Sequence, residues 1–458
     1  MDLKLSDVLE NNDSERIDSE YFQKKYLNLD KIISNTLPLK NISKVTDGDH
    51  SKFPENQKKE VRYLRSKDIK NYYLDNHDPI YVSSEYAEKQ KRSYITEHNI
   101  LISIMGNVGD ITITPDNFKK SIANRAVAII KNIQNINAYY LFGYLITKYA
   151  FLNIERLKIG GVQLRINLEV LEQLKIPTAT KRFQKMIESV IKESHKKQEQ
   201  SKTLYKQAEN LLLEELGLLD YAPSKQSVSV KSFSQSFGSS GRLDSEYYLP
   251  KYEQIMRSIT STKHKKLSAL VDICKSIEPG SDAYQDEGIP FVRVSNLTKF
   301  GLSNPDIHLS EDIADEETLE SLKPKKDTIL LSKDGTVGIA YTIKDETNVI
   351  TSGAILHLYL KDDAIKPEYL TLVLNSMLVQ MQSERDAGGS IIKHWKPSEI
   401  SEVLIPVIDE DIQLQIESKI KDSFRLKKES QNLLDLAKRA VEVAIEEGED
   451  VAMELMQA

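Results

Sequence analysis

One long uninterrupted pattern in the chain runs from Thr180 to Leu216, without glycine or proline. Apart from Lys197, apolar or small side chains recur along it at steps of three or four residues, namely Phe183, Ile187, Val190, Ser194, Ser201, Leu204, Ala208 and Leu211. This heptad-like spacing predicts a helix that packs along a seam. At about 1.5 Å per residue the helix is roughly 55 Å long, which exceeds what one compact core needs.

A second helix of the same kind is predicted over residues 409–447. Its stripe consists of Ile412, Ile416, Ile420, Ser423, Lys427, Ser430, Leu434, Ala437, Val441 and Ala444. Small residues such as Ser194 and Ser423 let two backbones approach closely. We therefore expect an antiparallel, coiled-coil-like pair related by pseudo-two-fold symmetry. The alternative is that each helix packs only on its own domain.

The two helices belong to an internal duplication, because six sequence blocks recur in the same order at nearly constant offsets. The matching blocks are Ile17–Phe22 with Leu243–Tyr248, Val61–Ile69 with Ile289–Leu297, Ile100–Gly109 with Ile329–Gly338, Gly160–Gly161 with Gly388–Gly389, Ile176–Pro177 with Ile405–Pro406, and Ile187–Ser194 with Ile416–Ser423. The chain is therefore two copies of a globular half followed by a long helix.

Each half is predicted to be of the α+β class, because its strand-like runs do not alternate regularly with helices. The expected strands lie at 61–65, 100–104, 126–131, 329–331 and 354–360, and the expected helices at 139–149 and 369–381. The Gly106-x-x-Gly109 and Gly335-x-x-Gly338 blocks follow strands and predict hairpin turns. Thr180 and Asp409 are the expected helix N-caps, and Gly217 and Gly448 the left-handed C-caps.

These patterns divide the chain into six segments. A first globular domain covers 1–179, a long helix 180–217, a Pro/Ser-rich linker 218–241, a second globular domain 242–408, a second long helix 409–447, and a tail 448–458.

Composition narrows the class of protein further. The net charge of −7 argues against a protein coated in positive charge, but it leaves room for a local basic face. No run is apolar enough for a membrane span, and the N-terminus lacks a signal-peptide core. The single cysteine, Cys274, fits a cytoplasmic protein and is expected to be buried on a strand or turn.

Catalytic and metal-binding patterns do not emerge from the sequence. Asp78-Pro79-Ile80-Tyr81 lacks the second proline of an amine methyltransferase loop, and Gly335-Thr336-Val337-Gly338 lacks the lysine of a P-loop. The eight histidines do not pair at metal-ligand spacing. We therefore expect a binding protein without catalytic, cofactor or metal sites of its own.

Taken together, the chain resembles the DNA specificity (S) subunit of type I restriction–modification systems over almost its whole length. The resemblance rests on the two halves, each closed by Ile-Pro and a long helix, on Asp47-Gly48-Asp49-His50, and on Gly160-Gly161-Val162-Gln163. The second half has Ser276-Ile277-Glu278-Pro279-Gly280-Ser281 in place of the Asp-Gly-x-His turn.

This resemblance implies two target-recognition domains that read a bipartite double-stranded DNA target, with the helices as the spacer between half-sites. It implies docking of two modification subunits, which carry S-adenosylmethionine and methylate adenine at N6. A restriction subunit that uses ATP and Mg²⁺ is a further candidate partner.

Candidate DNA-binding residues are cationic or amide-bearing, or lie in glycine-flanked loops where the backbone can approach DNA closely. In the first half they are Lys44, Asp47, His50, Lys52, Arg65, Lys67, Asn107, Gln163 and Arg165. In the second half they are Lys275, Ser281, Arg293, Asn296, Lys333, Thr336, Ser390, Lys393, His394 and Lys396.

Several candidates have a structural alternative. Arg65 and Arg293 recur in both halves, so they are equally interpretable as shared ion-pair partners or phosphate anchors. For Trp395, we favour the role of a packing anchor in the core over that of a platform on which a base stacks. His50 and His394 can be loop histidines without a DNA contact.

Two rival functions stay open at this stage. One is a duplicated noncatalytic scaffold that binds proteins and not DNA, and the other is an enzyme with an unrecognised site. The repeated basic loops favour the DNA-reading subunit.

Overall fold

The computed structural model describes residues 16–54, 58–75, 78–160, 164–389 and 391–457. The chain divides into two compact units, Met1–Glu199 with Lys427–Ala458, and Gln200–Leu426. Both divisions fall inside the long helices. Each unit therefore contains the body of one repeat together with one part of each helix, so the helices belong to the two cores instead of forming separate spacer segments.

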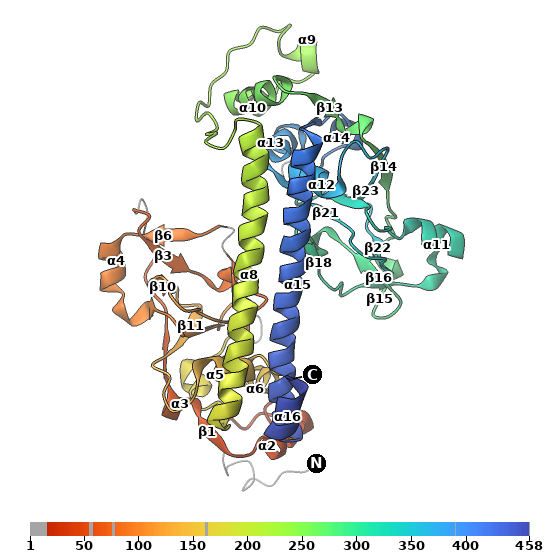
Figure 1. The fold of residues 1–458 in the computed structure, drawn as a ribbon. Helices are drawn as coiled ribbons and strands as arrows, with labels where there is room; N and C mark the ends of the chain where they lie inside the picture. Colours follow the sequence, from red (N-terminus) through yellow and green to blue (C-terminus); the bar gives the residue numbers. More distant parts are fainter. Residues whose placement is uncertain (1–15, 55–57, 76–77, 161–163, 390, 458) are drawn as a thin grey trace. The chain divides into compact units, whose positions relative to one another are not determined.

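The two long helices are α8, Lys181–Glu215, and α15, Glu410–Glu446 (Figure 1). Both begin at the predicted caps. The Phe183 N–H donates to the Thr180 hydroxyl at 3.3 Å, and the Asp411 N–H donates to the Asp409 carboxylate at 2.9 Å. These side chains satisfy backbone donors that the first helical turn leaves unpaired.

The two helix ends differ from one another. Gly217 follows α8 with φ +65°, the left-handed conformation that the sequence predicts. Gly448 has φ +101° but an extended ψ of 162°, so the prediction of a left-handed cap is wrong there. The extended ψ instead leads the chain into a further helix, α16 (Glu449–Leu455), where the sequence suggested a tail. Ala452 and Met453 of α16 are buried in the core of the first unit.

In the first unit, the N-terminal part of α8 packs on the C-terminal part of α15. Ile187 and Ile191 share a buried core with Ala437 and Val441. In the second unit the roles are exchanged, because Tyr205, Ala208 and Leu212 of α8 lie in one core with Ile416 and Ile420 of α15. The helices are thus antiparallel, as predicted. The buried stripe of α8 uses Ile191, Tyr205 and Leu212 in place of their predicted neighbours Val190, Leu204 and Leu211, which are half-buried.

Two four-stranded sheets form the body of the first unit. One is antiparallel with the order β2-β11-β8-β9, and the other has the order β6-β3-β10-β7 with β3 and β10 parallel. Two-stranded pairs β1-β12 and β4-β5 complete it. The strands are β1 (Thr36–Pro38), β2 (Lys44–Asp47), β3 (Val61–Leu64), β4 (Ile69–Lys70), β5 (Tyr73–Leu74), β6 (Ile80–Val82), β7 (Tyr94–Ile95), β8 (Ile100–Ser103), β9 (Ile111–Ile113), β10 (Ser121–Ala123), β11 (Val127–Lys131) and β12 (Lys175–Pro177).

The second unit repeats this topology except at the edges of its second sheet, where β15 pairs with β19 and no described strand takes the place of β7 beside β22. Its sheets have the orders β14-β23-β20-β21 and β15-β19-β16-β22, with pairs β13-β24 and β17-β18. The strands are β13 (His264–Lys266), β14 (Val271–Lys275), β15 (Tyr284–Gln285), β16 (Ile289–Val292), β17 (Leu297–Thr298), β18 (Gly301–Leu302), β19 (His308–Leu309), β20 (Ile329–Ser332), β21 (Ala340–Thr342), β22 (Ile350–Thr351), β23 (Ile355–Leu360) and β24 (Leu404–Pro406). The duplication and the α+β class are confirmed.

The two shorter runs predicted as single helices, 139–149 and 369–381, are each a pair of helices. The helices are α2 (Lys24–Ile32), α3 (Leu39–Ile42), α4 (Ser84–Lys89), α5 (Ala138–Leu145), α6 (Lys148–Leu157) and α7 (Leu168–Leu171) in the first unit, and α9 (Phe237–Ser240), α10 (Pro250–Thr260), α11 (Glu316–Leu322), α12 (Pro367–Asn375), α13 (Met377–Asp386) and α14 (Pro397–Ser401) in the second. Thr147 separates α5 from α6, because its hydroxyl accepts from the Ala150 N–H and starts a new helix. Short 3-10 turns include η1 (Ser66–Asp68), η2 (Lys91–Ser93), η3 (Ser245–Tyr248), η4 (Leu267–Ala269), η5 (Ser281–Ala283), η6 (Val294–Asn296) and η7 (Glu311–Ile313).

The prediction that Cys274 is buried is wrong. Cys274 lies on β14, an edge strand, and is exposed. Thr46 occupies the equivalent position of β2 and is buried, because its hydroxyl donates to the Arg92 carbonyl in the covering turn η2 at 3.3 Å. Across the part of the chain that the structure describes, no helix is long and apolar enough to span a membrane.

Candidate nucleic-acid interface

One buried carboxylate at the end of β2 holds two exposed side chains, one from the turn that follows β2 and one from η2. His50 Nε2 lies 2.6 Å from Asp47 Oδ2, and an Arg92 guanidinium N–H donates to Asp47 Oδ1 at 2.6 Å. The Asp47 side chain is 11 % exposed, whereas those of His50 and Arg92 are 62 % and 68 % exposed. Asp47 therefore orients the other two side chains. Arg92 was not among the predicted residues, because nothing in the sequence places η2 beside β2.

Gly48 is required for this turn to approach β10. A Cβ at Gly48 would overlap the carbonyl oxygens of Ala123 and Asn124. Ser276 takes the equivalent place in the second unit, where its hydroxyl donates to the Thr351 carbonyl at 2.6 Å. The two repeats thus shape this turn differently, in line with the different sequences after β2 and β14.

A buried carboxylate also holds the segment that continues from His50. Asp49 is buried and accepts from the Ser51 N–H at 2.8 Å, the Tyr86 hydroxyl at 2.5 Å and the Tyr63 hydroxyl at 3.4 Å. Burial and, after it, the Asp49 charge raise the pKa of Tyr63, so this hydroxyl stays protonated and donating. These hydrogen bonds to Asp49 therefore fix the turn that follows β2 in the first unit.

The same turn borders a concavity of about 370 Å³ in the first unit. Its lining combines cationic, aromatic and amide side chains, namely Asp49, His50, Ser51, Lys52, Phe53, Tyr63, Arg65, Ile80, Asn124 and Arg125. The ring of Phe53 is 40 % exposed and meets Tyr63 edge to face at 5.1 Å between centroids. Three predicted residues, His50, Lys52 and Arg65, are thus brought together, and Arg125 joins them.

Arg65 and Arg293 are held by equivalent ion pairs. Arg65 Nη2 lies 2.8 Å from Asp68 Oδ1, and Arg65 Nη1 lies 3.4 Å from Asp78. Arg293 Nη2 lies 3.0 Å from Asp306, thirteen positions further on, as Asp78 is from Arg65. The hydrogen bond with Asp68 raises the pKa of Arg65. These pairs support the interpretation of both arginines as repeated structural residues.

The candidate residues that follow these arginines also have contacts within the protein. Lys67 Nζ lies 3.3 Å from Asp78, and this contact is the main cause of the lowered pKa of Asp78. Asn296 is buried; it accepts from the Arg293 N–H at 3.0 Å and donates to the Ser303 hydroxyl at 3.3 Å. Asp68 occupies the same place in the first unit and accepts from the Arg65 N–H at 2.9 Å.

The two Gly-x-x-Gly blocks form the predicted hairpin turns between β8 and β9 and between β20 and β21. All four glycines have positive φ, from +72° at Gly335 to +104° at Gly109. Asn107 and Thr336, at the tips, are exposed. A Cβ at Gly106 would lie 3.7 Å from the Ser66 hydroxyl, so the first hairpin is close to the segment that carries Lys67.

In each unit, the loop that precedes the Ile-Pro segment pairs with the Gly-x-x-Gly hairpin through isolated backbone β-bridges. Arg165 forms such bridges with Met105 and Ile159, and His394 forms the equivalent ones with Asp334 and Gly388. The glycine match is shifted by one residue from the sequence alignment, because Gly160 and Gly389 share φ values of +108° and +109°. His394 Nδ1 lies 2.8 Å from Asp334 Oδ1, and Lys333 also contacts Asp334.

The loop around Trp395 combines one buried side chain with exposed lysines. Trp395 is buried in the core of the second unit, as the packing-anchor interpretation predicts, and its counterpart Ile166 is buried too. Lys393 and Lys396 on either side are exposed. Lys275 and Ser281 are exposed near the edge strand β14. The candidates Gln163 and Ser390 lie outside the described residues.

A basic cluster lies on the antiparallel pair β2-β11. Lys44 and Lys131 are direct cross-strand partners, and Lys131 Nζ donates to the Arg92 carbonyl at 2.7 Å. Burial, followed by the charges of Lys44 and Arg92, lowers the pKa of Lys131. Like charges held this close favour an anionic partner such as phosphate.

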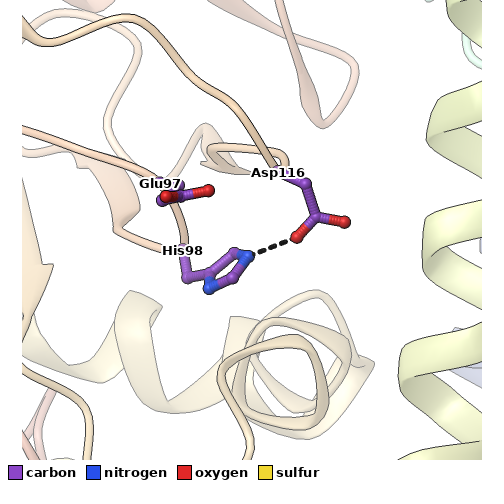
Figure 2. A group of neighbouring side chains, drawn as sticks. All are labelled: Glu97, His98 and Asp116. Carbon is purple, nitrogen blue, oxygen red and sulfur yellow. Dashed lines mark hydrogen bonds and ion pairs between the residues drawn. The ribbon is translucent and has the colours of Figure 1, made fainter.

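Three side chains in the first unit could each offer a ligand atom to a metal ion. These atoms of Glu97, His98 and Asp116 lie within 4.8 Å of one another (Figure 2). Each carboxylate already has a protein partner, however. His98 Nε2 lies 2.6 Å from Asp116, and Glu97 accepts from the Asn117 N–H at 2.9 Å. We interpret the group as a hydrogen-bonded closure of the β8–β9 hairpin.

The charge of Asp116 is also balanced within the unit. Lys192 of α8 lies 3.2 Å from its second oxygen and 2.9 Å from Glu188. The hydrogen bond with His98 is the main cause of the lowered pKa of Asp116. The equivalent residues of the second unit are Lys326, Asp327 and Asp345, so this ligand set is not part of the repeat.

Comparison with known proteins identifies the family. A family model described as the type I restriction modification DNA specificity domain matches twice, over residues 34–210 and 262–435. Similar solved structures include the S subunit of a type I restriction–modification system from M. genitalium, 13 % identical, covering 93 % of this chain and 96 % of that chain with a TM-score of 0.39. Another is the HsdS subunit from Thermoanaerobacter tengcongensis, 13 % identical, covering 92 % and 96 % with a TM-score of 0.28. The comparison with curated proteins finds no match.

Because the two matched segments cover most of the chain, it belongs to the type I restriction–modification DNA specificity family. It is a sequence-recognition subunit, a class that is noncatalytic by itself.

Proposed function

We propose that each repeat reads one part of a bipartite DNA target, and that α8 and α15 set the distance between the two parts. The observation that carries the proposal is the repetition of exposed polar loops on one duplicated fold. The turn after β2, the Gly-x-x-Gly hairpins and the loops at Arg165 and Lys393 recur at equivalent positions. Sites of this kind position a protein through phosphates and select sequence through base edges.

The partners follow from the family. We expect two modification subunits to dock on the helices and the flanking surfaces of the units, and to supply S-adenosylmethionine and adenine-N6 methyl transfer. A restriction subunit would add ATP- and Mg²⁺-dependent steps. The binding residues proposed in this chain are the candidate residues named from the sequence, with Arg65, Arg293 and Asn296 acting chiefly as supports for their loops.

A mobility-shift assay tests DNA binding directly. The chain, together with its modification subunit, should bind duplex DNA with an affinity that falls steeply as salt rises. A duplicated scaffold that binds only proteins would show no salt-sensitive DNA binding under any pairing, and this result would reject the proposal.

The spacer role has its own test. Inserting four residues into both α8 and α15 lengthens each helix by about 6 Å, between one and two base-pair rises. The expected result is a methylated motif whose spacer is longer by one or two base pairs, with the specified bases of both half-sites unchanged. Altered bases with an unchanged spacer would contradict the role of the helices.

A further inference from the structure

The two repeats place side chains of opposite charge at the same point of their folds. Asp49 forms a parallel bridge with Asn124, and Ile277 forms the equivalent bridge with Ser352. The residues that follow these bridges are His50 and Arg125 in the first unit, and Glu278 and Gly353 in the second. One repeat thus presents two potential cations where the other presents one carboxylate.

The Glu278 carboxylate lies beside Gly353, the residue that corresponds to Arg125. Arg125 is anchored by its backbone N–H, which donates to the Asp49 carbonyl at 2.9 Å. In the second unit, a Cβ at Gly353 would overlap the carboxylate of Glu278. Gly353 therefore leaves room for the Glu278 carboxylate, which would have to move if residue 353 carried a side chain such as that of Arg125.

Both charged groups are available to a ligand. Arg125 and Glu278 are exposed, and among the described residues neither side chain has an ion pair or a hydrogen bond. Arg65, at the wall of the same concavity, is by contrast held by Asp68 and Asp78. Of the two arginines that line this concavity, Arg125 is therefore the one whose guanidinium N–H donors have no hydrogen-bond partner among the described residues.

The surrounding first-unit turn is also more polar than the fold requires. Its supports Asp49, Tyr63 and Tyr86 correspond to Ile277, Phe291 and Ile313, which pack in an apolar cluster in the second unit. The same topology is thus stable with either set of side chains. Because the fold does not need Asp49, Tyr63 and Tyr86 to be polar, we infer that these side chains serve to hold the turn that carries His50. This inference supports a binding role for the turn.

Glu278 has few favourable partners on DNA. Phosphates repel a carboxylate, whereas the exocyclic amino group of cytosine, or that of adenine, donates a hydrogen bond to it in the major groove. A guanidinium has the complementary preference, because its paired N–H donors match O6 and N7 of guanine.

We propose that Arg125 and Glu278, which lie at the same point of the two repeats, are specificity-determining residues with opposite hydrogen-bonding character, Arg125 reading a guanine in one half-site and Glu278 reading an exocyclic amino group in the other. The inference rests on the proposed function, since it assigns the chemistry by which each half selects bases. Neither residue was among the sequence-derived candidates.

The test uses the chain in complex with its modification subunits and maps methylated motifs on bacterial genomic DNA by long-read sequencing. Arg125→Gln should relax a guanine position in one half-site, with the discrimination falling on the order of 10- to 100-fold. Glu278→Gln should relax a cytosine or adenine position in the other half-site by a similar factor. Whether the position that loses specificity is a cytosine or an adenine shows which of the two amino groups Glu278 contacts.

Matched controls are Lys40→Gln on α3 and Glu316→Gln on α11, both exposed. They should leave both half-sites unchanged, and all four variants should unfold at the wild-type midpoint because they remove no contact within the described protein. The inference is overturned if neither Arg125→Gln nor Glu278→Gln changes the motif. It is also overturned if Arg125→Gln weakens binding equally on all sequences and flattens the salt dependence, which is the signature of a phosphate contact.

Failure of the proposed function gives a different result. In that case the wild-type complex methylates no two-part motif at all. A wild-type two-part motif that both variants leave intact rejects only the roles of Arg125 and Glu278.

Discussion

The hydroxyl of Ser194 donates to the backbone carbonyl of Ser430 at 2.8 Å, and the hydroxyl of Ser430 donates back to the carbonyl of Ser194 at 2.7 Å. Ser423 donates in the same way to the Ser201 carbonyl at 2.8 Å. Ser194 and Ser423 are equivalent in the two repeats, as are Ser201 and Ser430. Each repeat therefore contributes both kinds of partner, which is the property of a self-complementary interface.

This relationship predicts a large effect of Ser430→Val. The substitution adds bulk at a position where two backbones are close, and it removes hydrogen bonds to Ser194 and to the Tyr73 hydroxyl, which lies 2.8 Å from Ser430. We expect the free energy of unfolding of the first unit to fall by about 2–4 kcal/mol in urea titrations. Ser418→Val, on an exposed position of α15, should cost less than about 0.5 kcal/mol. Equal effects of the two substitutions would contradict close packing at Ser430.

A buried histidine predicts acid sensitivity of the second unit. His357 is buried, Nε2 lies 2.8 Å from the Thr351 hydroxyl, and burial lowers its pKa from 6.5 to about 4. The unfolded state binds this proton below about pH 6.5 and the folded state only near pH 4, so stability is full above pH 6.5 and is lost as the pH falls. Between pH 7 and pH 5 the loss from this residue is about 2 kcal/mol. Urea unfolding of the second unit at both pH values measures it.

The first repeat supplies the control for this prediction. Ile129 and Ala123 occupy the positions equivalent to His357 and Thr351, and both are buried. The double variant His357→Ile with Thr351→Ala should therefore fold and should lose this part of the pH dependence. A steep loss of stability below pH 6.5 that persists in the double variant would assign it to other groups.

Arg65 is predicted to matter for stability and not for base selection. Arg65→Ala leaves the buried carboxylate of Asp68 without its ion-pair partner. We expect the free energy of unfolding of the first unit to fall by about 1–3 kcal/mol, while the methylated motif of the complex stays the same. A motif relaxed at one guanine with unchanged stability would instead make Arg65 a base reader.

The group at His98 predicts independence from metal ions. Because Lys192 and His98 already balance Asp116, the thermal midpoint should be the same in EDTA and in added Zn²⁺. Asp116→Asn should lower the midpoint slightly in both conditions, since it weakens the contact with His98. A midpoint that rises in Zn²⁺ for the wild type, and not for Asp116→Asn, would reveal a metal site.

The sequence predicts those parts of this fold that depend on local patterns. Heptad spacing, Thr180 and Asp409 as caps, and the repeated glycines locate the long helices and the hairpins. Charge partners formed by strand pairing are not visible in the same way. Nothing local links Asp47 to Arg92, or places Arg125 beside His50, because both contacts arise from pairing between strands far apart in the chain.

The shared location of Arg125 and Glu278 shows the limit most clearly. A sequence alignment places Glu278 opposite His50 as one more difference between the halves. Only the bridges Asp49–Asn124 and Ile277–Ser352 show that Arg125 and Glu278 directly follow the same paired point of the two folds. Exposure follows the same rule, since Cys274 is exposed while its counterpart Thr46 is covered by η2.

The exposed lysines of the second unit predict a measurable share of the salt dependence. Lys393 and Lys396 flank the buried Trp395, so their positions are fixed while their side chains reach solvent. Lys396 has only a loose ion pair with Glu399, at 3.7 Å, and is 73 % exposed. If both lysines contact phosphates, Lys393→Ala with Lys396→Ala should weaken binding to every duplex and reduce the slope of log K against log salt by about 2. Lys265→Ala with Lys266→Ala, on the exposed positions of β13, is the matched control and should leave the slope unchanged. A slope unaffected by the Lys393 and Lys396 substitutions would place these side chains away from the DNA backbone.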